Sequence, residues 1–261
     1  MENVGGGRRV RPGCRGHTLR TVPVAYREHA PPPALAPVVA CLWEHEPGAE
    51  HVQRVIPDGC VDLIWLAERE LVVAGPDTAA RTVALPAGAR SSGIRLRPGA
   101  AGAVLGLPAC ELRDREVPLE DVWGASVAPL REAIATAAPT RRLALLSAAV
   151  AGRHAAPDPL VAAAARRLGR PGTRIADVAA DLGVGERRLH RRTQAAVGYA
   201  PKVLARVARL RRLVTVSADE PLAARAYAAG YASQAHMGDE VRRLTGLTPV
   251  RFLEDAALTA A

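Results

Sequence analysis

Ile175-Ala-Asp-Val-Ala-Ala-Asp-Leu-Gly183 and Leu222-Ala-Ala-Arg-Ala-Tyr-Ala-Ala-Gly230 are two copies of one pattern, 47 positions apart. After each glycine the offset becomes 48, as expected if one residue had been inserted at a turn. Three pairs continue the match at this offset: Leu189 and Met237, Gly198 and Gly246, and Pro201 and Pro249. Agreement over so many positions indicates a duplicated supersecondary unit.

The first copy predicts two helices joined by a tight turn. Apolar spacing places these helices over 174–182 and 186–196, and Gly183 supplies the turn between them. Thr173 is the expected N-cap of the first helix, because its hydroxyl can accept a hydrogen bond from an unpaired backbone N–H. Gly185 directly precedes the second helix. A short helix, a glycine turn and a second helix form the helix-turn-helix pattern.

The second copy repeats this arrangement. Asp219 is the expected N-cap of its first helix, and Ser233 is the expected N-cap of a second helix over 234–244. Between the copies, an apolar stripe predicts a helix over 202–216, which at 1.5 Å per residue is about 22 Å long. A connector of this kind can hold two recognition helices in successive major-groove segments, about 34 Å apart on one face of a duplex.

Positive charge is concentrated in the same part of the chain. The whole sequence has 35 Lys and Arg against 26 Asp and Glu, a formal net charge of +9. From residue 158 onward there are 17 basic and 10 acidic residues, whereas the first 157 residues contain 18 and 16. A GC-rich genome would explain the preference for Arg over Lys, but not this clustering. The distribution indicates a polyanion-binding module attached to a nearly neutral segment.

The helix over 186–196 is the first candidate for nucleic-acid contact. Its inner face is expected to consist of Leu189, Thr193 and Val197. The remaining faces carry five basic residues: Arg187, Arg188, His190, Arg191 and Arg192. Arginine can pair bidentately with guanine O6 and N7, and its charge favours phosphate. A solvated basic face is the simpler alternative, but the helix-turn-helix pattern around the helix favours DNA contact.

The stretch from about residue 160 to 253 resembles the DNA-binding domain of AraC/XylS-type transcription regulators. The matching segments are 175–179, Leu182-Gly-Val184, Gly198-Tyr-Ala-Pro201, 228–237 and Thr245-Gly-Leu-Thr-Pro249. The resemblance implies double-stranded DNA as the partner, and contact with RNA polymerase if the protein is an activator. It places base-reading residues at seven positions: Arg187, His190, Arg191, Gln234, Ala235, His236 and Asp239.

Six further positions complete the predicted DNA-binding set: Thr173, Gly185, Arg188, Lys202, Ser233 and Arg242. The second copy departs from the family pattern, because Met237 stands where the family usually has Phe and Gly238 where Ser or Thr is common. Asp239 places a carboxylate at a reading position, where it can accept from cytosine N4 but repels phosphate. We therefore expect the first copy to contribute most of the affinity.

Residues 51–97 predict a small antiparallel sheet or barrel. Four short apolar runs are separated by turn residues such as Pro57-Asp-Gly59: they are 61–66, 71–74, 82–85 and 93–97. We expect a short helix over 34–46 before these runs. After them we expect a short helix over 100–107 and a loop over 112–123 packed on the sheet.

Parts of this segment resemble the N-terminal domain of one subgroup of these regulators. The parts are 57–65, Ala74-Gly-Pro76 and 93–100. The resemblance implies a β-rich, often cupin-like unit that senses a small-molecule effector or forms a homodimer. Asp62 is expected to cap the turn at 58–59 or to pair with Arg95. The three tryptophans are expected in the core: Trp43, Trp65 and Trp123.

Residues 126–157 predict a helical pair interrupted at Pro139. Its leucines either pack on the chain's own sheet or face a second copy in a dimer, and the sequence favours neither alternative. The fold class expected overall is α+β: a tail over 1–24, a β-rich domain over 25–125, this linker, an all-α DNA-binding domain over 158–255 and a tail over 256–261.

The four cysteines, Cys14, Cys41, Cys60 and Cys110, contain no CxxC pair, so buried free thiols are expected. Cys60 follows a turn and precedes a strand, a place that favours a partly exposed thiol. The alternative function is a DNA-repair protein with a methyl-accepting cysteine held on zinc, which such scattered cysteines disfavour. Since neither a signal peptide nor a membrane-spanning apolar run is present, we expect a cytoplasmic protein. As a regulator it is expected to have no enzymatic activity, cofactor or metal.

Overall fold

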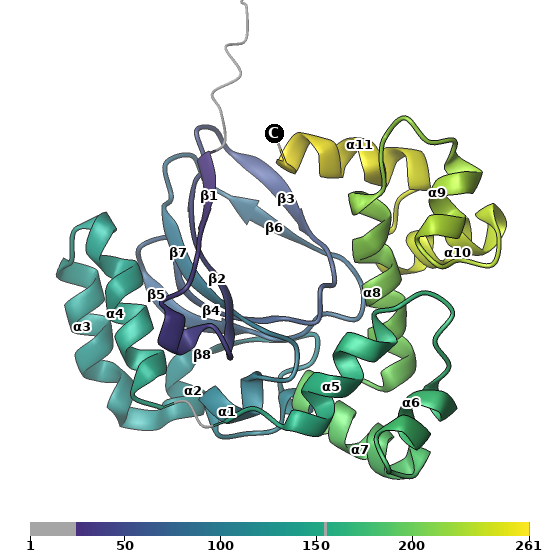
Figure 1. Ribbon diagram of the computed structural model, residues 1–261. Helices are drawn as coiled ribbons and strands as arrows, with labels where there is room; N and C mark the ends of the chain where they lie inside the picture. Colours follow the sequence, from purple (N-terminus) through teal and green to yellow (C-terminus); the bar gives the residue numbers. More distant parts are fainter. Residues whose placement is uncertain (1–24, 154–155, 261) are drawn as a thin grey trace, which may run out of the picture.

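A β-rich domain and a helical domain lie side by side in the computed structural model, which describes residues 25–153 and 156–260 (Figure 1). The β-rich domain contains these strands: β1 Ala25–His29, β2 Val39–Glu46, β3 His51–Val55, β4 Val61–Leu66, β5 Glu70–Ala74, β6 Arg81–Leu85, β7 Ser91–Leu96 and β8 Glu116–Pro118. The four strands expected from the apolar runs are all present, as β4, β5, β6 and β7.

The strands form a rolled hairpin. All pairs are antiparallel, and three of them are nested: β2 with β7, β3 with β6, and β4 with β5. Pairing of β4 with β7 closes the roll and gives a six-stranded sheet of order β1-β2-β7-β4-β5-β8 beside the two-stranded β3–β6 ribbon. This is a jelly-roll arrangement, which cupins share, and the expected β-rich fold is confirmed.

The prediction of a helix over 34–46 is wrong. Only a single 3-10 turn, η1 (Pro33–Leu35), precedes strand β2. β2 lies between β1 and β7 and is buried on both faces, with Val39, Leu42 and Trp43 all at or below 9 % exposure. A strand buried on both faces reads as a continuous apolar run, in which helical spacing also occurs by chance.

The helices after β7 cover the large sheet from one face and from its lower end in the view of Figure 1. They are α1 Ala101–Leu105, η2 Ala109–Glu111, α2 Leu119–Trp123, η3 Gly124–Val127, α3 Ala128–Thr136 and α4 Pro139–Ala151. Ile134, Leu146 and Val150 are fully buried in the same core cluster as the sheet. The helical pair therefore packs on its own sheet, as in the first of the two alternatives.

Seven helices form the described part of the C-terminal domain: α5 Pro159–Leu168, α6 Ile175–Asp181, α7 Glu186–Val197, α8 Pro201–Thr215, α9 Leu222–Ala228, α10 Gln234–Thr245 and α11 Pro249–Ala260. They enclose two separate cores. One includes residues of α5, α6 and α7, the other residues of α9, α10 and α11, and α8 contributes to both. Each copy of the sequence pattern thus builds its own core.

Two predicted helix caps are wrong. α6 begins one residue later than expected, with Arg174 at the N-cap position and no side-chain cap. α9 begins after Pro221, again without a side-chain cap, while the backbone N–H of Asp219 donates to the Ser217 hydroxyl. In both places the N-cap residue, Arg174 or Pro221, has a side chain with no acceptor for the free N–H groups.

Candidate nucleic-acid interface

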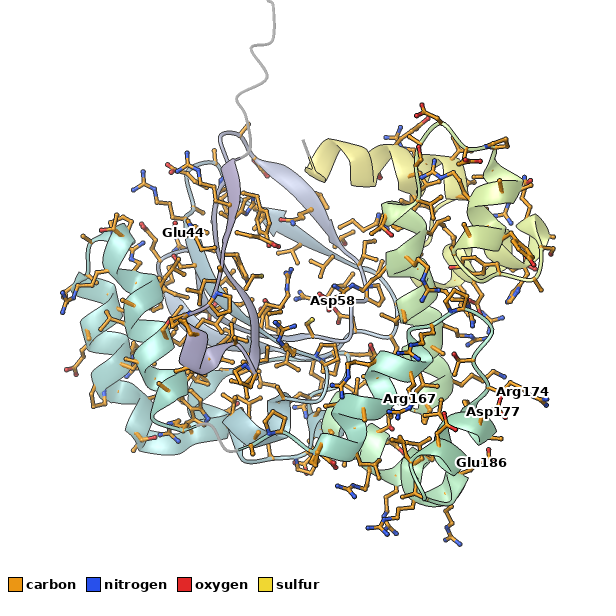
Figure 2. The ribbon with its side chains drawn as sticks, viewed as in Figure 1. Glu44, Asp58, Arg167, Arg174, Asp177 and Glu186 are labelled. Atoms are coloured by element: carbon orange, nitrogen blue, oxygen red, sulfur yellow. The ribbon has the colours of Figure 1, made fainter. Side chains whose placement is uncertain are left out.

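Helix α7 presents its basic residues to solvent. Leu189, Thr193 and Val197 are at most 1 % exposed and form its inner face, as predicted. Four predicted contact residues lie on its exposed side: Arg187, Arg188, His190 and Arg191. Figure 2 shows Glu186 of α7, Asp177 of α6 and the N-cap residue Arg174 on the side of the helical domain that faces away from the β-rich domain. This side is open to a long ligand.

Arg192 has a different role from its neighbours on α7. Its Nε and Nη2 donate to the two carboxylate oxygens of Asp158, at 2.7 and 2.5 Å. Asp158 also caps α5, since its Oδ1 accepts from the backbone N–H groups of Leu160 and Val161. The bidentate pair therefore ties the recognition helix to the start of the domain.

Helix α10 occupies the equivalent place in the second unit. Met237, Val241 and Leu244 are buried, and the Ser233 hydroxyl accepts from the backbone N–H of His236 at 3.1 Å, which confirms the predicted cap. The exposed side carries four of the predicted contact residues: Gln234, Ala235, Asp239 and Arg242. Asp239 lies 3.8 Å from Arg242, so the acid at this reading position has a positive neighbour.

His236 makes contacts with three residues of its own domain. Its Nδ1 accepts from the backbone N–H of Ala232 at 3.2 Å, its Nε2 lies 3.5 Å from Glu240, and its ring meets the edge of Tyr231 at 5.5 Å. With Nδ1 already accepting, Nε2 is the ring nitrogen left for a base, and using it requires giving up the contact with Glu240.

Glu240 is a residue that the sequence analysis missed. It is only 6 % exposed, and it accepts from Arg206 at 3.0 Å and from Arg209 at 2.8 Å. The Arg209 guanidinium also lies over the ring of Tyr231, 5.6 Å from its centre. This network joins α10 to α8. Its sequence signal was an acidic residue directly before the inner-face Val241, at the position that Arg192 occupies in the first copy.

The remaining predicted contact residues lie at helix starts. Gly185 is the N-cap of α7 with extended backbone, and Lys202 is exposed in the first turn of α8. Thr173 precedes the N-cap of α6. Backbone N–H groups at helix N-termini favour anions, because they are unpaired and lie at the positive end of the helix dipole. Phosphate contacts at these three positions stay predictions.

A polar cluster occupies the inner face of the large sheet. Asp62 accepts from the indole N–H of Trp43 at 2.8 Å and lies 3.3 Å from Arg95 Nε. Arg95 is also 3.6 Å from Asp58 and 3.4 Å from Glu28. Pairing of Asp62 with Arg95, one of the two predicted alternatives, is thus confirmed. Burial raises the pKa of Asp62 from 3.8 to about 6, against the opposing effect of Arg95.

Replacing Asp62 with asparagine should change how stability depends on pH. Because the pKa of Asp62 is higher in the folded than in the unfolded chain, its protonation stabilises the fold below about 4, and this stabilisation is lost as the pH rises to about 6. We therefore expect the unfolding free energy of Asp62→Asn, relative to wild type, to increase with pH across this window. Urea unfolding at both ends of the window measures this, with the exposed Asp121→Asn as control. A difference independent of pH would refute the expectation.

The cysteines do not form a cluster. Cys41 and Cys60 are buried free thiols, Cys110 is a partly exposed one, and Cys14 lies outside the described residues. The idea of a partly exposed Cys60 is wrong: the residue is 5 % exposed, and burial raises its pKa well above the usual range, which opposes formation of the thiolate. Over 25–153 and 156–260, His, Cys, Asp and Glu form no group of three arranged to hold a metal.

Comparison with known proteins agrees with the geometry. Residues 178–255 match a helix-turn-helix domain family, and residues 27–118 match a domain of unknown function, DUF6597. The chain thus contains a helix-turn-helix domain, with a distinct β-rich domain in front of it. Its helix-turn-helix domain is of the AraC type, the DNA-binding domain of transcription regulators, as the sequence resemblance predicted.

Two solved structures show more distant similarity. The C-terminal domain of AraT, a response regulator from Geobacillus stearothermophilus, is 19% identical, with 38% of this chain and 86% of that chain covered and a TM-score of 0.35. ToxT from Vibrio cholerae O395 is 11% identical, with 83% and 96% covered and a TM-score of 0.42. No curated protein matches the chain. Among the described residues, every helix is too short or too polar to cross a bilayer.

Proposed function

We propose that this protein is a sequence-specific transcription regulator that reads two successive major-groove segments of double-stranded DNA with α7 and α10. The observation that carries the proposal is the pair of equivalent helices, each with a buried apolar face and an exposed basic or polar face. They are joined by α8, whose 15 residues correspond to about 22 Å. This single chain can therefore occupy two half-sites, so dimerisation is compatible with binding but not required for it.

The proposed assignment of base and phosphate contacts follows from the exposed side chains. On α7, Arg187, His190 and Arg191 read bases, while Arg188 adds charge toward phosphate. On α10, Gln234, Ala235, His236 and Asp239 read bases, and Arg242 balances the acid. Phosphate contacts fall to the helix starts and their neighbours: Thr173, Gly185, Lys202 and Ser233. Because the net positive charge of the exposed reading face is greater on α7, this helix supplies most of the affinity.

The β-rich domain is proposed to receive a signal, from a small-molecule effector or from a second copy of the chain. Support comes from the polar cluster around Arg95, which continues to the surface at Asp58. The backbone carbonyl of Asp58 accepts from Arg211 of α8 at 3.5 Å. A change in the conformation of the cluster can thus act, through Asp58 and Arg211, on the helix that joins the two reading units. Contact with RNA polymerase belongs to the proposal only if the protein activates transcription.

Fluorescence anisotropy with DNA tests the proposal. A duplex is first selected from a random library by the full-length protein, then titrated with unlabelled random competitor and salt. We expect specific binding that Arg187→Ala and Arg191→Ala each weaken by about 1–3 kcal/mol. The matched control is Arg113→Ala with Arg141→Ala, which removes two exposed arginines from the β-rich domain and α4. Binding that competitor abolishes, or equal losses in both pairs, would contradict sequence-specific reading.

A further inference from the structure

The end of α7 packs closely against the β-rich domain. Gly198 follows the helix with φ +92°, and a Cβ added there would lie 2.4 Å from Pro76 Cγ and 3.2 Å from the carbonyl oxygen of Ala109. Both contacted residues belong to the β-rich domain, in the loop after β5 and in η2. Such a close approach admits only glycine, so the position of this recognition helix is closely defined relative to the β-rich domain.

The end of α10 is held by the same domain through hydrogen bonds. The carbonyl oxygen of Leu244 accepts from the backbone N–H of Ala80 at 2.7 Å, and that of Thr245 accepts from Arg54 Nη1 at 3.1 Å. Carbonyls in the last turn of a helix have no partner within the helix, so these bonds satisfy groups that would otherwise need water. Ile56, which follows β3, packs against the core of the second unit. Figure 1 shows the β3–β6 ribbon on the side of the β-rich domain next to α8 and α11.

The two contacts involve equivalent points of the duplicated units. Gly198 and Gly246, which end α7 and α10, correspond at the offset of 48, and the carbonyls held by Ala80 and Arg54 lie directly before Gly246. The two units have separate cores, and α8 is the one helix that contributes to both. Their relative orientation therefore depends on three links: α8, a close approach between the units at Gly230, where an added Cβ would lie 3.3 Å from Pro171 Cα, and this double contact with the β-rich domain.

We propose that the β-rich domain is a brace that fixes the spacing and orientation of the two recognition helices, so that the protein accepts one distance between its DNA half-sites. This inference rests on the proposed function and adds how the protein selects the distance between the two half-sites. One inserted base pair moves the second half-site by about 3.4 Å and rotates it by about 34–36°. A braced pair of helices cannot follow this displacement, whereas a pair joined only through α8 and the single contact of Gly230 with Pro171 can bend.

The test uses the full-length protein and the selected duplex, with half-sites located by footprinting and one or two base pairs inserted between them. For wild type, we expect the dissociation constant to rise about tenfold or more on insertion of one base pair. For Arg54→Ala with Ile56→Ser, which loosens the second unit, we expect a rise of about threefold or less. Arg90→Ala is the matched control, because Arg90 pairs with Glu46 on the same domain and should keep the wild-type ratio.

Arg54→Ala alone removes one hydrogen bond and no apolar contact, so it tests the same trend in a variant expected to fold. Thermal unfolding is recorded for every variant. Equal tolerance of insertions by wild type and the loosened variants would overturn the brace, while specific binding to the uninserted duplex would leave the proposed function intact. Absence of specific binding at every spacing would overturn the proposed function, and the brace with it.

Discussion

Replacing Gly198 with alanine is expected to reduce the free energy of unfolding by about 2–5 kcal/mol. Part of the loss is conformational, since an alanine at φ +92° costs about 1–2 kcal/mol. The larger part is steric: the new Cβ would lie 2.4 Å from Pro76 Cγ, a ring atom that cannot rotate away. Overpacking of this kind costs about 1–3 kcal/mol. Urea unfolding followed by circular dichroism measures the total.

Gly246→Ala provides a matched control for this variant. Gly246 follows the equivalent helix at φ +72°, but the nearest atom to its added Cβ is Arg54 Nη1, at 3.7 Å. It should therefore show the conformational cost without the steric one. Pro76→Ala in the Gly198→Ala background should restore part of the stability, because it removes the ring. Equal losses at both glycines, or no recovery in the double variant, would show that the domains are not in close contact at this point.

Replacing Glu240 with alanine is expected to cost about 2–4 kcal/mol, because it leaves Arg206 and Arg209 side by side without their shared partner. The arginines are about one quarter exposed, at 23% and 24%, so water offsets part of the penalty. Glu240→Gln keeps the shape and some of the hydrogen bonds and should lose less. Urea unfolding gives the size of the effect, and hydrogen exchange of α9 and α10 amides shows whether the second unit loosens first.

The control for Glu240 is Glu254→Ala on α11. Glu254 pairs with Arg251 at 3.6 Å, and both side chains are more than half exposed, so the expected loss is within about 0.5 kcal/mol. Similar losses for the two variants would mean that burial does not strengthen the Glu240 network. Hydrogen exchange that changes uniformly over both domains would mean that the network does not belong to the second unit.

The helical domain could be predicted in detail because its determinants are local. Gly183 and Gly230 both lie at positive φ, 64° and 90°, as turns between two helices require. The inner-face residues followed directly from helical periodicity, including Leu189 and Met237. The exposed reading faces then followed by elimination, which is why the predicted DNA-contact residues on α7 all lie on its solvent side.

The β-rich domain could be predicted only in part, because its pairings join distant residues. β2 pairs with β7 about fifty residues later, and this burial on both faces gave its sequence a helix-like spacing. Contacts between elements were missed for the same reason. Asp158 with Arg192, and Glu240 with Arg206, each lie 34 residues apart, and no local pattern links their charges.

These two ion pairs have a consequence for how a duplicated chain folds correctly. Arg192 and Glu240 occupy the same place in the two copies, at the offset of 48, and each pairs with the helix that opens its own unit. Their charges are opposite. If α10 took the place of α7 beside α5, Glu240 would meet Asp158. If α7 took the place of α10 on α8, Arg192 would meet Arg206 and Arg209. The opposite charges thus favour pairing of each helix with its own unit. They disfavour exchange of helices between the two copies, within one chain or between chains.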